Sequence, residues 1–436
     1  MKLVRALYGL KSSGASWRHM FKTYIEKKLG FKPCVMDGDL YYRRQKKPDG
    51  SEYYELLLVY VDDVLACSHD PKSIMESIGT EYVLKDGYDI PKIYLGADIA
   101  KVQNADLTYS WAMGSKSYVK GALDTVKRLL AEDGRAFKSK HRHDGPLPKS
   151  YKPEIDTTPE CNAELTSRYQ QLIGILRWAV ELGRIDIQIE VSLMSSYQMN
   201  PRMGHLEALY LIFHFLDKHP CIYLLMDQYQ PELDEMFFEH DASWQEFYGD
   251  VYEEMPPNMP EPLGTPVSTL FMADSDHASN VVTRRSHSGI LGFVNSAPII
   301  HYSKKQNTVE GSTYGAELVA LRICRDLVVG TRLKLRSIGV PLNGPTTVLC
   351  DNNGVVKNTS IPTSTLAKKH NAINYHIVRE AAAAGILRVG KESTESNKAD
   401  VLTKILDYKR KTRLLQGVCY ENFRDSKRFV LPGQED

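Results

Sequence analysis

Two adjacent carboxylates, Asp62 and Asp63, are the first residues of this 436-residue chain whose type and spacing could do chemistry. They lie between the apolar runs 54–61 and 64–67, which predict the two strands of a hairpin. Carboxylates there could hold Mg²⁺, which prefers oxygen ligands, and two such ions can clamp the oxygens of a phosphoryl transfer. The alternative is a plain hairpin turn, where Asp is favoured because its side chain bonds to the backbone.

Four more carboxylates lie at or near element ends in the last part of the chain, and they are Asp274, Glu317, Asp351 and Asp400. Glu317 shares a predicted helical face with Leu321, Cys324 and Val328, where an unpaired carboxylate would be costly. Each acid has a simpler alternative. Asp351 could cap the following helix, Asp400 could favour a helix N-terminus, and Glu317 could face solvent. Only the fold could bring all four together.

The charge balance predicts a polyanionic partner. The formal net charge is +1, but residues 227–261 hold 11 acids and no Lys or Arg, so the rest of the chain has a net charge of +12. This asymmetry favours nucleic acid, and the alternative is a solvated mixed surface. The seven cysteines form no Cys-x-x-Cys pair, which argues against a zinc knuckle and fits an intracellular protein, cytoplasmic or nuclear. No apolar run approaches the ~20 residues of a membrane span, so no membrane partner is expected.

Hydrophobic periodicity divides the chain into segments. Residues 111–225 are mainly helical, with helices predicted over 117–130, 167–199 and 202–219. Residues 226–265 carry the acids and five prolines, which indicates a linker or a surface insertion. The order β-β-β-α-β-α-α-β-α then predicts a mixed α/β domain, with elements at 268–273, 288–295, 298–303, 313–330, 346–350, 352–357, 371–384, 387–390 and 398–405.

Several segments resemble the Pol polyproteins of copia-type LTR retrotransposons. Residues 58–63 (LVYVDD) resemble the catalytic hairpin of a reverse transcriptase, and residues 2–11 followed by Trp17 resemble the LYGLK…W element. Further segments follow in the family's order, at 94–96 (the FLG strand), 169–176 and 184–187 (connecting helices). The resemblance implies a polymerase palm in which Asp62 and Asp63 hold metal and Tyr60 contacts nucleic acid.

The four later acids resemble the ribonuclease H signature of the same polyproteins, through residues 274–276, 312–317, 350–352 and 399–404. The resemblance implies that two Mg²⁺ or Mn²⁺ ions are held by Asp274, Glu317, Asp351 and Asp400, with Asp276 as a second choice for the first position. It further implies hydrolysis of the RNA strand of an RNA–DNA hybrid. The candidates for backbone contacts are Lys304, Lys305, Lys368, Lys369 and Arg379. The alternative role of the lysines is solubility.

Departures from the family pattern limit these expectations. Ser12 and Gly14 stand where Gln and Pro usually follow the LYGLK element. The third polymerase carboxylate would lie upstream of that element, so we expect polymerase activity to be lost or to need a missing N-terminal part. His277 replaces a Trp and Tyr314 or Gly315 replaces a Glu, but neither change removes a metal ligand. The competing hypothesis is a decayed or domesticated fragment that binds nucleic acid without cleaving it.

The expected architecture is a multidomain α/β and α+β chain. It comprises a truncated reverse transcriptase palm (1–110), a helical thumb and connection (111–225), an acidic linker or insertion (226–265), a ribonuclease H-like mixed-sheet domain (266–410) and a C-terminal tail (411–436). The expected partners are an RNA–DNA hybrid and a nucleic-acid template, together with the missing N-terminal segment of the polyprotein.

Overall fold

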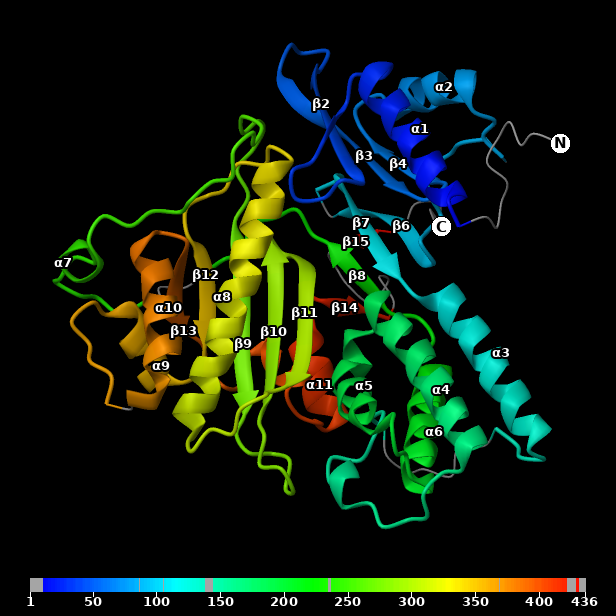
Figure 1. Cartoon of the computed structure of the whole chain (residues 1–436), viewed down its shortest axis with the longest axis vertical. Helices are drawn as coiled ribbons and strands as arrows, with labels where there is room; N and C mark the ends of the chain where they lie inside the picture. The colour runs from blue at the N-terminus through cyan, green and yellow to red at the C-terminus, as the bar shows by residue number, and fades with distance from the viewer. Residues whose placement is uncertain are drawn as a thin grey trace. The chain divides into compact units, whose positions relative to one another are not determined.

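The computed structural model describes residues 11–85, 87–104, 106–137, 144–233, 237–367 and 369–421, with the backbone of 429–430 (Figure 1). Most of the LYGLK element and Lys368 lie outside the described residues. The chain divides into two units. Unit 1 comprises residues up to 90 with Glu254–Val267 and Val329–Asn343, and unit 2 comprises Pro91–Glu253, Ser268–Val328 and the residues from 344 onward. No described helix is long and apolar enough to cross a membrane.

This division differs from the predicted domain organisation. The predicted helical segment 111–225 and the C-terminal mixed sheet cluster into one unit, while the acidic segment is split between the units after Glu253. Sequence periodicity reports single elements, and it carries no information on which elements pack together.

Unit 1 contains the predicted hairpin. Its sheet has the order β1-β2-β3-β4 and is antiparallel throughout. Helices α1 (Ser13–Lys27) and α2 (Pro71–Glu81) contribute to its core, which includes Phe21, Leu57 and Ile78. The strands are β1 (Lys32–Pro33), β2 (Leu40–Lys46), β3 (Glu52–Tyr60) and β4 (Asp63–Cys67).

Unit 2 begins with a sheet that the sequence did not predict. Its order is β14-β8-β7-β6-β15, with β5 also paired to β6. The prediction of a strand over residues 94–96 is wrong. Tyr94 ends β5, and the chain turns at Leu95 and Gly96, whose φ angles are +48° and +84°. The strands are β5 (Ile93–Tyr94), β6 (Ala97–Asn104), β7 (Tyr109–Gly114), β8 (Tyr223–Met226), β14 (Cys419–Tyr420) and β15 (Phe429–Val430).

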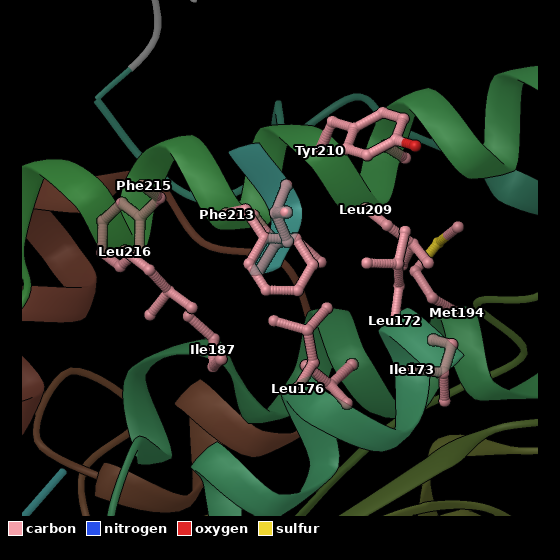
Figure 2. Close-up of a cluster of buried hydrophobic side chains, with 14 of the residues drawn as sticks. Leu172, Ile173, Leu176, Ile187, Met194, Leu209, Tyr210, Phe213, Phe215 and Leu216 are labelled. Carbon is pink, nitrogen blue, oxygen red and sulfur yellow. The ribbon is translucent and has the colours of Figure 1, made fainter. Parts of the chain in front are cut away.

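The helices of unit 2 bury an apolar core that contains Leu172, Leu176 and Phe213 (Figure 2). The predicted helices near 117–130 and 202–219 are confirmed, but the long helix over 167–199 is broken. Gly183 adopts a φ of +100° after α4, and a Cβ there would lie 3.1 Å from Leu224. The elements are α3 (Lys116–Glu132), η1 (Pro153–Ile155), α4 (Ala163–Glu181), η2 (Ile185–Ile187), α5 (Gln188–Met194), η3 (Ser195–Tyr197) and α6 (Met203–Lys218).

The predicted C-terminal mixed sheet is confirmed, with strand order β11-β10-β9-β12-β13. The strands β11, β10 and β9 are antiparallel, whereas β9, β12 and β13 run parallel. The elements are β9 (Thr269–Asp276), β10 (His287–Val294), β11 (Ala297–Lys305), α8 (Thr313–Ser337), β12 (Thr346–Cys350), α9 (Asn353–Ser360), η4 (Lys369–Asn371), α10 (Ala372–Ala383) and β13 (Leu387–Lys391).

Two elements follow this sheet where the sequence predicted one helix and a tail. The predicted helix 398–405 is the 3₁₀ helix η5 (Lys398–Leu402), and α11 (Tyr408–Leu415) was not predicted. Both elements contribute to a core that also contains sheet residues such as Met272 and Leu291. They therefore cover the sheet face on which those side chains lie.

A buried ion-pair network fixes α11. The Lys411 ammonium donates to Glu190 Oε1 at 2.6 Å and to the carbonyl of Asp186 at 2.8 Å. The Asp186 carboxylate in turn pairs with Arg184, which is fully buried. Burial raises the pKa of Glu190, and the charge of Lys411 opposes that increase. Removing one partner would therefore leave an uncompensated charge in the interior.

We expect Lys411→Met to lower the free energy of unfolding by about 3–5 kcal/mol, because Glu190 then loses its counter-ion. The double variant Lys411→Met/Glu190→Gln should recover a large part of that loss. Urea unfolding followed by circular dichroism measures both changes.

The matched control is Lys409→Met on the exposed side of α11, which should change stability by no more than about 0.5 kcal/mol. An equal urea midpoint for Lys411→Met and Lys409→Met would contradict a stabilising role for the buried pair.

Candidate active site: a carboxylate cluster at the edge of the mixed sheet

Strand register places two of the predicted acids side by side. The parallel strands β9 and β12 pair Ala273 with Cys350, so the next residues along the two strands are Asp274 and Asp351. The carboxyl ends of parallel strands meet at one edge of a sheet, which is where α/β folds place their ligands. The predicted strands therefore deliver these two carboxylates to a common edge.

Glu317 lies at the same edge, although it comes from α8. Its side chain is 3% exposed, and the Ser275 N–H donates to its Oε1 at 3.4 Å. The alternative in which Glu317 faces solvent is therefore wrong. The helix-cap alternative for Asp351 is also wrong, because Asn352 caps α9 by accepting from two backbone N–H groups.

Asp400 reaches the cluster through a close approach of η5 to the sheet. The Asn397 side chain caps η5 and donates to the carbonyl of Ala273 at 3.1 Å. Gly289 on β10 pairs with Asp274 and has no side chain. A Cβ at Gly289 would lie 2.8 Å from the carbonyl oxygen of Ala399. Glycine at this position thus allows η5 to pack against the strand beside Asp274.

Burial and neighbouring carboxylates raise the pKa values of Asp274 and Glu317. Burial, and then the charge of Asp400, raises the pKa of Asp274 to about 8. Burial, and then the charges of Asp274 and Asp351, raises the pKa of Glu317 well above its ordinary value. Asp274 and Asp400 are 2% and 0% exposed. The structure therefore brings all four predicted acids together, and their role as metal ligands stays a prediction.

Asp276, the second choice for the first position, has a different environment. It lies two residues beyond Asp274 on β9, and its Oδ1 accepts the N–H of His287 at 2.5 Å. Burial raises the pKa of Asp276 to about 7. Its carboxylate is held by the neighbouring strand, while Asp274 interacts with the other acids of the cluster.

Sequence reasoning missed the residues that hold these acids. The Thr403 hydroxyl donates to Asp274 Oδ2 at 2.6 Å. Lys404 Nζ lies 2.6 Å from Asp400 Oδ1, and Arg410 donates to Asp400 Oδ2 at 2.7 Å. Thr403 and Lys404 belong to the segment 399–404 that carried the family resemblance. Arg410 lies on the unpredicted helix α11, and no sequence signal pointed to it.

Cys350 is a further neighbour of the cluster. Glu317, Cys350 and Asp351 form a group of three potential metal-ligating side chains, and Cys350 Sγ lies 4.0 Å from Glu317 Oε2. Burial, and then the charge of Glu317, raises the pKa of the Cys350 thiol well above its ordinary value. A protonated thiol is a poor ligand for a hard cation such as Mg²⁺. The oxygen atoms of the acids are thus the better donors.

Asp62 and Asp63 form a different kind of site in unit 1. Tyr60 pairs with Asp63, so Val61 and Asp62 make the turn of the hairpin, and all four side chains are exposed. Val61 has a φ of +57°, an outlier for a β-branched residue, and its carbonyl accepts the Trp17 indole N–H at 2.8 Å. Among the described residues, neither aspartate belongs to a group of three metal-ligating side chains.

The candidate nucleic-acid contacts differ in accessibility. Lys304 and Lys369 are exposed and Lys305 is half-buried. The prediction for Arg379 is wrong, because this residue is 2% exposed and its guanidinium donates to the carbonyls of Asn358, Ile361 and Pro362. Its charge also lies over the Trp244 ring of the acidic segment, 4.8 Å from the ring centroid. Arg379 therefore has a structural role.

The chain was compared with known proteins. No protein-family model matches it. The retrovirus-related Pol polyprotein from transposon RE1 of Arabidopsis thaliana is 24% identical over 410 residues, which are 93% of this chain and 24% of that protein. The corresponding polyprotein from transposon TNT 1-94 of Nicotiana tabacum is 24% identical over 413 residues, which are 93% of this chain and 27% of that protein.

A shorter relative and two solved structures complete the comparison. The putative transposon Ty5-1 protein of Saccharomyces cerevisiae is 30% identical over 220 residues, 49% of this chain and 64% of that protein. The N-terminal RNase H domain of a Mycobacterium tuberculosis protein is 16% identical, with 34% of this chain and 97% of that chain covered and a TM-score of 0.25. The RNase H1 called LC11, solved with an RNA/DNA hybrid, is 14% identical, with 31% and 94% covered and a TM-score of 0.26.

The sequence relatives agree with the motifs quoted above. The chain spans about a quarter of the length of the plant polyproteins that it matches. The match nevertheless extends over 93% of this chain and includes both aspartate-bearing regions. The chain is thus a homologue, over nearly all of its length, of the retrovirus-related Pol polyproteins of copia-type transposons.

Proposed function

We propose that unit 2 hydrolyses the RNA strand of an RNA–DNA hybrid at the carboxylate cluster. The observation that carries this proposal is the convergence of Asp274, Glu317, Asp351 and Asp400, which come from four separate elements, at one edge of the mixed sheet. Like charges placed so close destabilise the folded state. A fold that nevertheless assembles them favours a functional role for the cluster. The homology to Pol polyproteins supports the same conclusion.

The cluster fits divalent cations of the Mg²⁺ or Mn²⁺ type. Its donors are carboxylate oxygens, which hard cations prefer, and bound cations would favour the ionised forms of Asp274 and Glu317, whose pKa values are raised by burial and neighbouring acids. We assign the four acids as the ligands of two ions. The chemistry supplied by two such ions when bound is activation of a water and stabilisation of the leaving 3′ oxygen.

The remaining residues position these acids. Thr403 orients Asp274 through its hydroxyl, and the Ser275 N–H orients Glu317. Lys404 and Arg410 hold the carboxylate of Asp400 from two sides. Selection of a hybrid would follow from groove shape and contacts with 2′-hydroxyl groups rather than from base sequence.

A second candidate function is nucleic-acid binding without cleavage. The observation that favours it is the double ion pair on Asp400, because Lys404 and Arg410 already neutralise a carboxylate that metal would otherwise occupy. Both candidates predict binding, so only cleavage distinguishes them.

We do not assign a polymerase site to the described residues by themselves. Asp62 and Asp63 supply two carboxylates on an exposed turn, and no third metal-ligating side chain within the described part of the chain joins them. We propose that polymerisation requires a further polypeptide segment that provides another carboxylate. Efficient primer extension by the purified chain would contradict this proposal.

The nuclease proposal predicts cleavage of a labelled RNA–DNA hybrid in the presence of Mg²⁺ or Mn²⁺. Asp351→Asn should reduce the rate at least as much as the roughly 10–100-fold loss that follows mutation of residues that orient metal ligands. Gel analysis of the RNA strand, with single-stranded RNA and duplex DNA as parallel substrates, measures rate and selectivity.

Asp124→Asn is the matched control, because Asp124 is an exposed carboxylate on α3 in the same unit. It should cleave like the unmodified chain. If the unmodified chain binds hybrid and never cleaves it with either metal ion, the nuclease proposal fails and the binding function replaces it.

The raised pKa of Asp274 predicts how metal-free stability depends on pH. Between the ordinary value near 4 and the folded value of about 8, the folded state holds more protons than the unfolded state, so stability decreases as pH increases through this window. In EDTA, Asp274→Asn should raise the melting temperature at pH 9 by about 2–4 °C, equivalent to about 1 kcal/mol in a domain of this size. The increase should be smaller at pH 5.

Differential scanning fluorimetry at both pH values measures this effect. Adding Mg²⁺ at pH 9 should shrink the difference, because only the unmodified cluster then gains bound cations. An increase of the same size at pH 5 and pH 9 would show that charge burial at Asp274 is not its cause.

A further inference from the structure

A cavity of about 350 Å³ lies in unit 2 beside the carboxylate cluster. It is lined by residues of the helical part, at 149–154 and 193–197, and by residues of the mixed-sheet part, at 276–287, 305 and 403–410. Thr403, Lys404 and Arg410 belong to this lining, and each contacts Asp274 or Asp400 directly. Whatever occupies the cavity is therefore adjacent to the cluster.

The carboxylates of the lining are bound to the backbone. Glu154 accepts the N–H of Val281 at 2.9 Å, and Asp276 accepts the N–H of His287 at 2.5 Å. Asp407 caps α11 by accepting the N–H of Arg410 at 2.9 Å. The negative groups thus stabilise turns and an element end, and within the described residues they form no close ion pairs with the basic side chains of the same lining.

Lys404 and Arg410 pair with Asp400, whereas the other basic side chains of the lining have no close counter-ion among the described residues. Lys149, Lys152, Arg285 and Lys305 line the cavity, and within the described part of the chain none of them lies within 4 Å of a carboxylate. Burial, and then the charge of Arg285, lowers the pKa of Lys305, against a smaller opposite effect of Glu154. A bound anion would stabilise the charged forms of these two neighbouring, half-buried cations.

The same lining offers an unused hydrogen-bonding group. The Tyr151 hydroxyl is buried and has no hydrogen-bond partner among the described residues. A hydroxyl beside several cations suits the oxygens of a phosphate, which accept several donors at once.

A second cavity continues the first. It has a volume of about 470 Å³ and shares Ser196, Arg285 and Lys305 with the first cavity. It adds the basic residues Arg177 and Lys304, neither of which pairs with a carboxylate among the described residues. The cations are therefore distributed over two adjoining cavities. Their combined positive charge exceeds the charge that a single phosphate could neutralise.

We propose that these two cavities form a track for the sugar–phosphate backbone of one nucleic-acid strand, which leads to the carboxylate cluster. The proposal rests on the proposed function for the identity of the polyanion. It adds Lys149, Lys152, Arg177 and Arg285 to the binding surface, and it makes the helical part of unit 2 a part of the substrate site.

The test measures binding separately from cleavage. The full chain is titrated in EDTA against fluorescein-labelled single-stranded DNA, and anisotropy gives the affinity at several salt concentrations. Each phosphate contact contributes about 0.7 to the slope of log affinity against log salt for a single strand. Lys152→Gln/Arg285→Gln should therefore lower the magnitude of the slope by about 1.4 and weaken binding most strongly at low salt.

Two further variants keep the result interpretable. Lys120→Gln removes an exposed lysine of α3 outside both cavities and should leave the slope unchanged. Lys305→Gln, at the junction of the two cavities, should lower the slope by about 0.7 even if the double variant fails to fold. Circular dichroism verifies the fold of each variant.

The outcomes separate this proposal from the nuclease proposal. An unchanged slope in folded Lys305→Gln would overturn the track, even if the chain cleaves hybrid. A second outcome would also overturn the track. Inorganic phosphate at matched ionic strength would displace the oligonucleotide from the unmodified chain but not from the cavity variants, and the cavities would then be assigned to a small anion. A lowered slope without any cleavage would support the track and reject only the nuclease.

Discussion

Buried negative charge around Asp274 is the constraint on which the rest of unit 2 depends. Asp274 and Asp400 are almost inaccessible to water, and each raises the cost of ionising its neighbours. Such an arrangement persists only if the surrounding elements hold it rigidly or if cations compensate it. Both conditions are met in part, because Thr403 fixes Asp274 by a hydrogen bond and Arg410 and Lys404 neutralise Asp400. The cost of this charge argues against a stabilising role for the cluster.

The elements that support the cluster are themselves fixed by buried polar contacts. Helix α11 carries Arg410 to Asp400, and Lys411 on the same helix is anchored to Glu190 and Asp186 of the helical part. The glycine at position 289 allows η5 to lie against β10. The helical part and the mixed sheet are therefore energetically linked through α11, which agrees with their clustering as one unit. A substitution in the helical core can therefore alter the positions of the acids without contacting them directly.

The distribution of charge within this unit is compatible with the proposed polyanionic substrate. The acids that line the first cavity accept hydrogen bonds from the backbone, and among the described residues Arg285 and Lys305 have no carboxylate partner within 4 Å. In the part of the acidic segment that belongs to unit 2, Trp244 packs on Arg379, whose burial removes this cation from the binding surface. The excess of basic residues outside that segment is therefore only partly available to a partner, and the fold decides which cations remain accessible.

The sequence by itself determined the order of strands and helices in the mixed sheet, because apolar periodicity and turn residues are local signals, and it identified the four acids through their motifs. It also located the Asp62–Asp63 hairpin correctly. It did not determine the break at Gly183, the helix α11 or the sheet formed by β5–β8, β14 and β15, because these depend on contacts such as Gly183 with Leu224 and Lys411 with Glu190, which join residues far apart in the chain. It misjudged Arg379 for the same reason, since burial is a property of the packed structure. Only tertiary structure decided that Asp274 and Asp351 are neighbours, because parallel register aligns strand ends that lie 77 residues apart in the chain.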